Sequence, residues 1–578
     1  MKLQWQKAWL VVCLCWPFVF GATVEEFRES LIIRPLQDGK LASHFAFTTL
    51  LKGASPRDPS TLGQEDTSQH HTLFPLTLGQ LLREYAVTEL HLTLNAGKWN
   101  YDRWGYPDEA GVGTGAELWA WMGDSATHNV DERWKGLRNA LSGLFCASLG
   151  SIDEQRTTSP TLTFRPEGSL PKWEREHLLR HGSLPSEHVC TENLTPFLKL
   201  LPCKSFTGIA HLLNPHRVFD ADWHGLGIHV RYLENQGVEV RLSFQTVTDP
   251  VRHPGGKRDW SLRSVFDRSI DRSCPVARTS EVLVELPAQE SVIVSPDPTV
   301  VRSGYATFDV SNVSEPLDIG MHWPQEAQFE YPVESSLVPL THVSVQRTLK
   351  GSTQSRGRLS VSVTNNLPIT IQASYLESMP WLLQFYLHSL EVHSNGVSRG
   401  MFCLSFQSTQ MPYVLGQTLM QRSDDLVSIV SYTPPVPHSR PTLLQALLTL
   451  PAQSTVHLSM DVIKPFLRYT EHPPDAQRGW DLPPAVIIPL VPVNSSSLDD
   501  STLEARGVIG RRNRHPHRVY TSILLVDLAT PDFSMPYNVI IMSCTLIALI
   551  FGSVFNLLTR KFSILRVSGE KPPTVRPE

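Results

Sequence analysis

Alternation of apolar and polar residues is the most frequent pattern in this chain, and it predicts many short β-strands. In the segment ELHLTLN, for example, Leu90, Leu92 and Leu94 alternate with polar side chains. Glycine, asparagine and a total of 44 prolines punctuate such segments, which favours antiparallel β-sandwiches over a parallel α/β sheet. Further strands are expected from FRESLIIRPL, HFAFTTL, ELWAWM, GIHVRYL, VEVRLSF, SEVLVEL, RLSVSV, ITIQASYL and STVHLSMDV.

Two segments in the first half have helical periodicity instead. Residues 77–87 place four apolar side chains on one face of a short amphipathic helix, with Thr77 as its cap. A longer helix is predicted to begin at Asp131, where Trp134, Leu137 and Leu141 follow at helical spacing. The second half is almost entirely β in pattern. The sequence therefore predicts a mainly β (α+β) fold with a β-sandwich-type body and a domain boundary between residues 247 and 259.

A strongly apolar segment lies near the C-terminus. Residues 538–558 carry no charged side chain and would form a helix of about 31 Å, which is long enough to cross a bilayer. Arg560 and Lys561 follow the segment, whereas Asp527 and Asp532 precede it. By the positive-inside rule, the tail is cytoplasmic and the body lies on the opposite side of the membrane.

The N-terminus predicts a cleavable signal peptide. Lys2 and Lys7 precede an apolar stretch, and small residues follow it, so we expect cleavage after Gly21. An uncleaved anchor is the alternative. The chain is thus predicted to be a single-pass type I membrane protein of the secretory pathway. Its expected parts are a signal peptide (1–21), a lumenal α+β domain (22–250), a lumenal β-sandwich domain (251–537), a transmembrane helix (538–558) and a cytoplasmic tail (559–578).

Net charge gives no indication of a nucleic-acid partner. The formal charge is -5 and the basic residues are scattered along the chain. One basic segment, residues 506–520, contains Arg511, Arg512, Arg514 and Arg518. For this segment a solvated loop is favoured over a contact with lipid headgroups.

Cysteine count suggests a bond to another chain. Of eight cysteines, two lie in the predicted signal peptide and Cys544 lies in the predicted span, which leaves Cys146, Cys190, Cys203, Cys274 and Cys403. In an oxidising compartment an odd thiol is either buried and inert or paired with another chain. The apolar segment LSGLFCASL predicts a buried Cys146, whereas Cys190 and Cys203 are expected to be more accessible. The intramolecular pairing stays open.

Catalytic and metal-binding motifs are not found in the predicted lumenal part. There is no Gly-x-Ser-x-Gly elbow, phosphate-binding glycine loop or Cys-x-x-Cys pair. His177 and His181 would lie one helical turn apart, but the glutamate that a zincin requires is missing. We therefore expect two surface histidines, no metal site and no cofactor.

Three Asn-x-Ser/Thr sequons fit a glycosylated ectodomain. They lie at Asn193, Asn312 and Asn494. Asn193 is the least favoured acceptor because Pro196 and Cys190 are close to it in the sequence.

The predicted span carries a stripe of small and polar residues. Thr545, Ala548, Gly552 and Asn556 recur at steps of three and four, so they share one face of the helix. Such faces let helices approach closely, and each polar contact contributes roughly 0.6 kcal/mol. We expect this stripe to pack against other membrane helices; the alternative is that Asn556 only reaches the headgroups.

Several segments together resemble the PIG-T family, and they occur in order from Leu73 to Phe562. They are LFPLTLGQLLREYAVTELHLTLNAGKW, GAELWAWM, LSGLFCASL, VCTENLTPFLKLLPC, GKRDWSL, MPWLLQFYLHSL, TPDFSMPYNVI and FNLLTRKF. The resemblance implies a subunit of the glycosylphosphatidylinositol (GPI) transamidase, an endoplasmic reticulum membrane complex that attaches preassembled GPI anchors to the C-terminus of substrate proteins.

The resemblance also implies a role within that complex. The PIG-T family is non-catalytic, because acyl transfer uses a Cys-His dyad on a separate caspase-like subunit. It stabilises that subunit, holds the other membrane subunits and helps to present substrate proproteins and GPI lipid. The cysteine of the VCTENLTP motif, here Cys190, corresponds to the family's disulfide link to the catalytic subunit. Cys403 stands where no family cysteine is expected.

Two other classes of protein stay open on composition alone. A cell-surface adhesion or receptor ectodomain would be delivered to the plasma membrane and would carry complex glycans. A lumenal glycan-processing enzyme would depend on one or two carboxylates.

Overall fold

The computed structural model describes residues 25–66, 71–252, 256–287, 290–313, 315–332, 339–351, 353–394, 397–401, 426–468, 471–472, 479–491, 517–529 and 534–560. The predicted signal peptide and cytoplasmic tail lie outside these ranges. The chain divides into two compact units. The first comprises Met1–Pro465 with Gly479–Leu528, and the second comprises Phe466–Arg478 with Ala529–Glu578.

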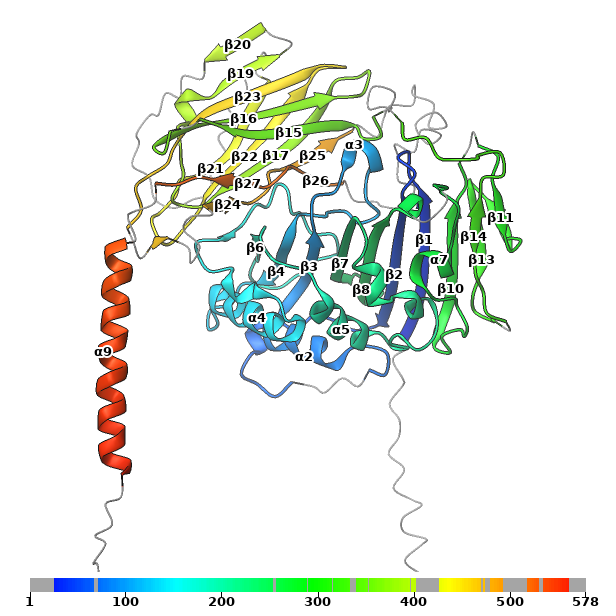
Figure 1. Ribbon diagram of the computed structural model, residues 1–578, viewed down its shortest axis with the longest axis horizontal. Coiled ribbons are helices and arrows are strands. Elements are labelled where there is room, and N and C mark those ends of the chain that lie inside the picture. Colours follow the sequence, from blue (N-terminus) through cyan, green and yellow to red (C-terminus); the bar gives the residue numbers. More distant parts are fainter. Residues whose placement is uncertain are drawn as a thin grey trace, which may run out of the picture. The chain divides into compact units, whose positions relative to one another are not determined.

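An eleven-stranded sheet organises the first half of the first unit (Figure 1). Its strand order is β12-β13-β10-β1-β2-β8-β7-β3-β4-β6-β5, and β1 pairs with β10 in parallel. The strands are β1 (Glu25–Pro35), β2 (Leu41–Lys52), β3 (Val87–Ala96), β4 (Gly115–Gly123), β5 (Thr157–Thr158), β6 (His177–Leu184), β7 (Trp223–Leu233), β8 (Gly237–Thr248), β10 (Ala277–Glu285), β12 (Val300–Arg302) and β13 (Tyr305–Asp309).

Helices cover one face of this sheet and form the main core with it. Leu90, Leu92 and Leu94 of β3 are buried there with Trp134 and Leu137 of α4. This follows from the alternation of β3, which directs every second side chain to the same face. The helices of this layer are α2 (Leu76–Glu84), α4 (Val130–Phe145), α5 (Thr191–Leu200), α6 (Pro215–Val218) and α7 (Leu262–Phe266), whereas α3 (Tyr101–Trp104) lies on the side of the sandwich (Figure 1).

A β-sandwich forms the second half of this unit. One sheet has the order β15-β16-β23-β19-β20, with β18 added against β23, and the other has the order β21-β22-β17-β25-β26. The strands are β15 (Val343–Lys350), β16 (Arg356–Asn365), β17 (Ile371–Met379), β18 (Gln384–Phe385), β19 (Glu391–Ser394), β20 (Val397–Met401), β21 (Val427–Thr433), β22 (Thr442–Leu450), β23 (Thr455–Ile463), β25 (Val486–Leu490) and β26 (Val519–Tyr520).

Two smaller sheets complete the β structure. One has the order β11-β14-β9 and the other pairs β24 with β27. Their strands are β9 (Trp260–Ser261), β11 (Ile293–Ser295), β14 (Gly320–His322), β24 (Trp480–Leu482) and β27 (Leu524–Val526). The mainly β prediction is therefore confirmed, although the first half contains a larger sheet than the sequence pattern indicated.

The predicted domain boundary near residue 250 needs correction. Strand β10 follows that point but pairs with β1, and β13 then pairs with β10. The change from the first sheet to the sandwich lies between β14 and β15. Alternation identifies a strand but does not identify its partner, and for this reason the boundary was misplaced.

Helix α9 (Ser534–Thr559) belongs to the second unit. Its segment Tyr537–Thr559, 23 residues long, is apolar enough to cross a membrane, and it is the one such helix among the described residues. This agrees with the span predicted at residues 538–558.

Candidate functional site

Cys190 lies at the start of helix α5 and presents a free thiol at the surface. The backbone N–H of Cys190 donates to Oδ1 of Asn193 at 2.8 Å, which fixes the first turn of the helix. On the other side of α5, Leu194 and Phe197 are buried in the core. Because rotation of α5 would expose these apolar side chains, the thiol is held in one position at the surface.

Asn193 links this turn to the end of helix α4. Its Nδ2 donates to the carbonyl oxygens of Phe145, at 2.8 Å, and Cys146, at 3.2 Å. The residue is only 1% exposed. A glycan needs the same amide nitrogen and access to solvent, so the expectation of a glycan on Asn193 is corrected, and the side chain has a structural role.

The other two sequons have different positions. Asn312 is exposed in a turn after β13, a position that leaves its side chain accessible. Asn494 lies outside the described residues. Glycans on Asn312 and Asn494 stay predictions.

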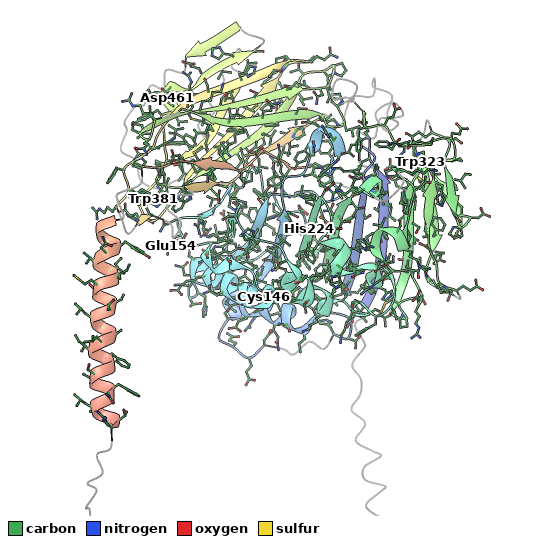
Figure 2. The ribbon with its side chains drawn as sticks, viewed as in Figure 1. Cys146, Glu154, His224, Trp323, Trp381 and Asp461 are labelled. Atoms are coloured by element: carbon green, nitrogen blue, oxygen red, sulfur yellow. A yellow bond between two sulfur atoms is a disulfide. The ribbon has the colours of Figure 1, made fainter. Side chains whose placement is uncertain are left out.

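Cys146 is the second exposed free thiol of the α4–α5 region (Figure 2). The prediction of a buried Cys146 is wrong. Phe145 and Ala147 on either side of it are buried, but Cys146 ends α4 in the left-handed conformation, with φ 51°. This turn directs its side chain outward, although its neighbours are apolar.

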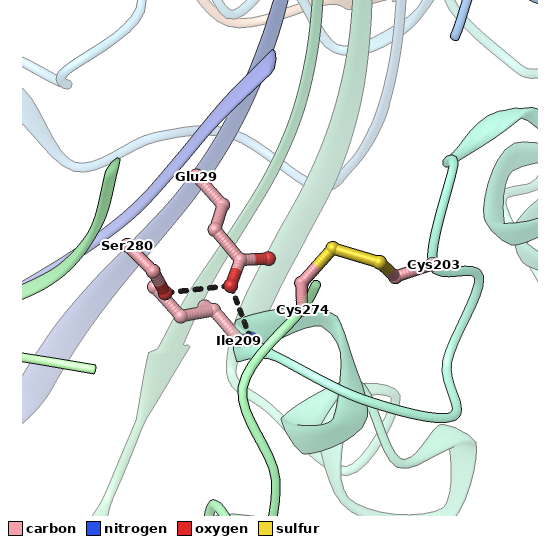
Figure 3. Close-up of a disulfide and its surroundings, with 5 residues drawn as sticks. All are labelled: Glu29, Cys203, Ile209, Cys274 and Ser280. Atoms are coloured by element: carbon pink, nitrogen blue, oxygen red, sulfur yellow. Dashed lines mark hydrogen bonds between the residues drawn. A yellow bond between two sulfur atoms is a disulfide. The ribbon is translucent and has the colours of Figure 1, made fainter. Parts of the chain in front are cut away.

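A disulfide joins Cys203 and Cys274, with their Cα atoms 6.0 Å apart (Figure 3). Cys203 follows α5 and Cys274 precedes β10, so the bond attaches the end of α5 to the large sheet. Beside it, Glu29 of β1 accepts hydrogen bonds from the Ser280 hydroxyl and the Ile209 N–H. Burial raises the pKa of Glu29 despite these two bonds. Of the five cysteines outside the predicted signal and span, Cys403 lies outside the described residues.

The face of the eleven-stranded sheet opposite the helices is polar and buried. It includes the residues that we call the polar layer, contributed by the sheet strands, by two loops and by the segment that contains β26. They are His44, Glu89, His91, Glu109, Glu117, Trp119, Glu167, His181, His229, Arg518 and Tyr520.

Arg518 is the central cation of one half of the polar layer. Its guanidinium lies 3.1 Å from Oε1 of Glu167. It also lies against a pair of aromatic rings that contact each other, 5.0 Å from the centroid of Trp119 and 4.9 Å from that of Phe164. The Glu167 carboxylate raises the pKa of Arg518 against the opposing effect of burial. Arg518 is therefore a buried partner of the sheet, and the prediction that placed it in a solvated basic loop is wrong.

Glu109 is the central anion of the other half. Burial opposes its ionisation, but the Arg241 guanidinium and His229 outweigh this effect and hold the pKa of Glu109 well below its usual range. His229 lies 3.3 Å from Oε2 of Glu109, and its Nδ1 lies 2.9 Å from Nδ1 of His91. Burial lowers the pKa of His229, which favours neutral imidazole in this chain of contacts.

Tyr520 and His181 extend the polar layer toward β6. The Tyr520 hydroxyl donates to Glu117 at 2.6 Å, and the second oxygen of Glu117 lies 3.1 Å from Nε2 of His181. His181 and His177 lie on strand β6, so the expected helical spacing and the expected surface position of His181 are both wrong. Glu117, Trp119 and Trp121 occupy every second position of β4, and this alternation was the sequence signal that could have shown that they share the face of the polar layer.

Apolar contacts continue the layer into the sandwich. Trp121 and Leu179 of the large sheet cluster with Leu376, Leu443 and Val486 of the five-stranded sheet. The two β domains of the first unit thus share a continuous buried interface. A buried interface of this kind opposes relative motion of the two domains.

The buried acids and histidines of this layer bond one another. Among the described residues, no group of three or more His, Cys, Asp or Glu side chains is arranged to hold a metal ion. The geometry favours a structural role for the layer, and it leaves the surface around Cys190 as the chemically addressable site.

The stripe predicted on the membrane helix is accessible in α9. Thr545, Ala548, Gly552 and Asn556 are all exposed, and a Cβ added at Gly552 would meet no atom within 4 Å. The Thr545 hydroxyl donates to the carbonyl of Ile541 at 2.7 Å, within its own helix. Packing of this face against another helix stays a prediction.

Comparisons with known proteins cover nearly the full chain. The family model described as "Gpi16 subunit, GPI transamidase component" matches residues 10–258 and 249–576. The Mus musculus protein "GPI-anchor transamidase component PIGT" is 35% identical over 569 residues, covering 93% of this chain and 90% of the relative. The Homo sapiens protein of the same name is also 35% identical over 569 residues, covering 93% of this chain and 91% of the relative.

A fungal relative gives the same result. The Schizosaccharomyces pombe protein "GPI transamidase component PIG-T homolog" is 32% identical over 553 residues, covering 94% of this chain and 91% of the relative. Coverage of this extent includes the Cys190 turn, both β domains and helix α9. The chain therefore belongs to the Gpi16, or PIG-T, family of GPI transamidase components.

Proposed function

We propose that this chain is a non-catalytic subunit that stabilises and scaffolds the GPI transamidase complex. The caspase-like catalytic subunit is its covalent partner, through an interchain disulfide at Cys190. The observation that carries this proposal is the free, exposed Cys190 thiol on a turn fixed by Asn193. Family membership supports the assignment to the complex.

The buried interface between the two β domains supports a scaffolding role. A platform that positions other subunits must keep its own surfaces in a constant arrangement, and the polar layer favours one arrangement of the two domains. The acyl-transfer nucleophile then belongs to another chain, as the family resemblance implies. This chain contributes contacts to the catalytic subunit, to the other membrane subunits, to substrate proproteins and to GPI lipid.

The endoplasmic reticulum membrane is the proposed location. Helix α9 crosses it once, with the body in the lumen and the tail in the cytoplasm. The basic residues after α9 support this orientation, and the Cys203–Cys274 disulfide fits an oxidising lumen.

A disulfide at Cys190 acts as a tether. For a short connection, a covalent link raises the effective concentration of a second contact to roughly millimolar. A weak noncovalent interface between the two subunits then becomes nearly permanent. Loss of the tether should loosen the complex without abolishing every contact in it.

Replacing Cys190 with serine is expected to abolish the covalent heterodimer. Full-length protein purified in mild detergent would be compared on reducing and non-reducing gels, and the linked peptide identified by mass spectrometry. Cys146→Ser is the matched control, since the Cys146 thiol is also free and exposed, and the backbone carbonyl of Cys146 also accepts a hydrogen bond from Asn193. Persistence of the linked species in Cys190→Ser, with loss in Cys146→Ser, would assign the bond to Cys146 instead.

We also propose that the stripe on α9 packs against helices of the other membrane subunits. Gly552→Leu is expected to reduce their recovery with this chain about two- to fivefold, because the added side chain separates the helices. Co-purification measures this effect. Ser543→Leu adds similar bulk on the opposite side of the helix and should leave the recovery of the other subunits unchanged. If both variants recovered these subunits as well as the unmodified chain does, α9 would be only a membrane anchor.

A further inference from the structure

Exposed apolar side chains occur on and beside strands β21 and β27 of the first unit. Val430 of β21 is 56% exposed, Val436 after it is 40% exposed, and Leu525 of β27 is 56% exposed. Strand β21 is the terminal strand of its sheet, and β27 belongs to the two-stranded sheet with β24. Single exposed apolar side chains need no explanation, but a contiguous patch indicates a surface for another molecule or for a membrane.

Side-chain contacts of two tryptophans connect these strands. On the β24–β27 sheet, the ring centroid of Trp480 lies 5.8 Å from the guanidinium of Arg156. Gln155, the preceding residue, accepts a hydrogen bond from Nε1 of Trp381 at 2.9 Å. Figure 2 labels Trp381 and Glu154 on the same side of the first unit. The loop that contains Gln155 and Arg156 therefore joins both rings into one surface.

The turn after β21 belongs to the same surface. The ring centroid of Trp381 lies 4.3 Å from that of His438, and a bridge between Val436 and Arg440 closes the turn that carries His438. Trp381 and Trp480 are both half-buried, so part of each ring is accessible. We call this surface the aromatic edge, and it comprises Trp381, Val430, Val436, His438, Trp480 and Leu525.

The chain runs from the aromatic edge directly into the membrane helix. Leu525 closely precedes Leu528, where the first unit ends, and α9 begins at Ser534. An extended chain covers at most about 3.6 Å per residue, so the chain from Leu528 to Ser534 covers at most about 22 Å. This reach is shorter than the hydrocarbon core of a bilayer, which is about 30 Å thick. The membrane surface that α9 enters is therefore within reach of the β27 end of the aromatic edge.

The chemistry of the aromatic edge fits the surface of a zwitterionic lipid layer. Tryptophan is enriched where a membrane meets water, because its ring is apolar and its Nε1–H is polar. The cation nearest these rings, Arg156, is accompanied by the exposed carboxylate of Glu154. Anionic lipids are concentrated in the cytoplasmic leaflet, so a surface of mixed charge suits the opposite leaflet.

We propose that the aromatic edge rests on the lumenal surface of the bilayer. Trp381 and Trp480 lie at the level of the headgroups, and Leu525 and Val436 contact the upper part of the acyl chains. This second contact restricts the tilt of the lumenal body, which a single helix would leave free. The inference rests on the proposed crossing of the membrane by α9, but it requires neither the Cys190 tether nor another subunit.

Quenching of tryptophan fluorescence by brominated lipid tests the proposal. The full-length protein is placed in nanodiscs of phosphatidylcholine with brominated or unmodified acyl chains, and bromine quenches only the tryptophans that approach the acyl chains. Helix α9 contains no tryptophan, and Trp480 is the last tryptophan of the chain. Mass spectrometry of the N-terminus first establishes that the signal peptide, which contains Trp5, Trp9 and Trp16, has been removed. Quenching then reports on the lumenal body alone.

The double variant Trp381→Phe/Trp480→Phe is expected to lower the quenched fluorescence at least about twofold, because it removes both interfacial rings. Trp173→Phe is the matched control, since Trp173 is also half-buried and its ring also stacks on a histidine, His177. Equal quenching in the double variant and the control would overturn the proposal.

A second variant serves if the double variant does not fold. Leu525→Glu places a charge against the acyl chains and should lower the quenching of the unmodified tryptophans about twofold. Val301→Glu is its control, because Val301 is a similarly exposed apolar residue on β12, 60% accessible. Equal quenching in these two variants would also contradict a lipid contact at the aromatic edge.

The remaining outcomes separate this inference from the proposed function. A chain that enters the discs but shows no quenching would overturn the aromatic edge while leaving the crossing by α9 intact. A chain that fails to enter the discs would overturn both. Quenching that disappears when the other subunits of the complex are added would place a protein on this surface and overturn the lipid contact.

Discussion

Arg518→Met should lower the free energy of unfolding of the lumenal body by about 3–5 kcal/mol. Methionine retains much of the apolar stem of arginine but removes the charge. Glu167, which lies 3.1 Å from the guanidinium with both side chains 8% exposed, would become a buried carboxylate without its principal partner. The rings of Trp119 and Phe164 would also lose their contact with this cation. Thermal and urea unfolding of the full-length protein in detergent, followed by tryptophan fluorescence, measures the loss.

Arg302→Met provides the control, because Arg302 is exposed on β12 and its replacement should change stability by less than about 0.5 kcal/mol. Glu167→Gln combined with Arg518→Met should be less destabilising than the sum of the two single changes, because each single change leaves one charge of the pair buried without its partner and the double change removes both charges. If Arg518→Met lowered the free energy of unfolding no more than Arg302→Met does, the polar layer would contribute little to the association of the two β domains.

The stability of the Arg518→Met variant also tests the proposed scaffold. The polar layer joins the large sheet to the segment that contains β26, and it excludes solvent from charged groups on both sides. Separation of the domains would expose apolar rings and break buried ion pairs together. Destabilisation by a single change at Arg518 would therefore show that the arrangement of the two domains depends on this interface.

The strands and the membrane helix could be predicted from sequence because their signals are local. Alternation in β3 reflects the two faces of a strand, and the apolar length of α9 reflects bilayer thickness. Resemblance to the PIG-T family added the identity of the complex, which no periodicity contains. The turn around Cys190 was identified only through that resemblance.

The polar layer could not be predicted because its contacts are distant in sequence. Arg518 and Glu167 are separated by 351 positions. Glu89, His91 and Glu117 occupy the polar positions of alternating strands, which usually face solvent. A second sheet covers them here, and the alternation of one strand carries no information about what covers its polar face.

The cysteines show the same limit. Cys146 lies in an apolar segment, yet the left-handed end of α4 directs it outward. The local sequence places Cys203 near Cys190, whereas the fold pairs it with Cys274, 71 positions away. The odd number of lumenal cysteines indicated that at least one thiol is free or bonded to another chain. Only the fold identifies which cysteines are paired.

Replacing both Cys203 and Cys274 with alanine is expected to cost about 4 kcal/mol, because a bond between residues 71 positions apart restricts the unfolded chain strongly. Thermal unfolding without reductant measures the loss, and Cys146→Ala is the matched control because Cys146 is unpaired and exposed. The bond also attaches the end of α5, so the double variant should form less of the Cys190-linked heterodimer. Unchanged stability would contradict the entropic argument, whereas lower stability with normal heterodimer formation would show that Asn193 alone positions Cys190.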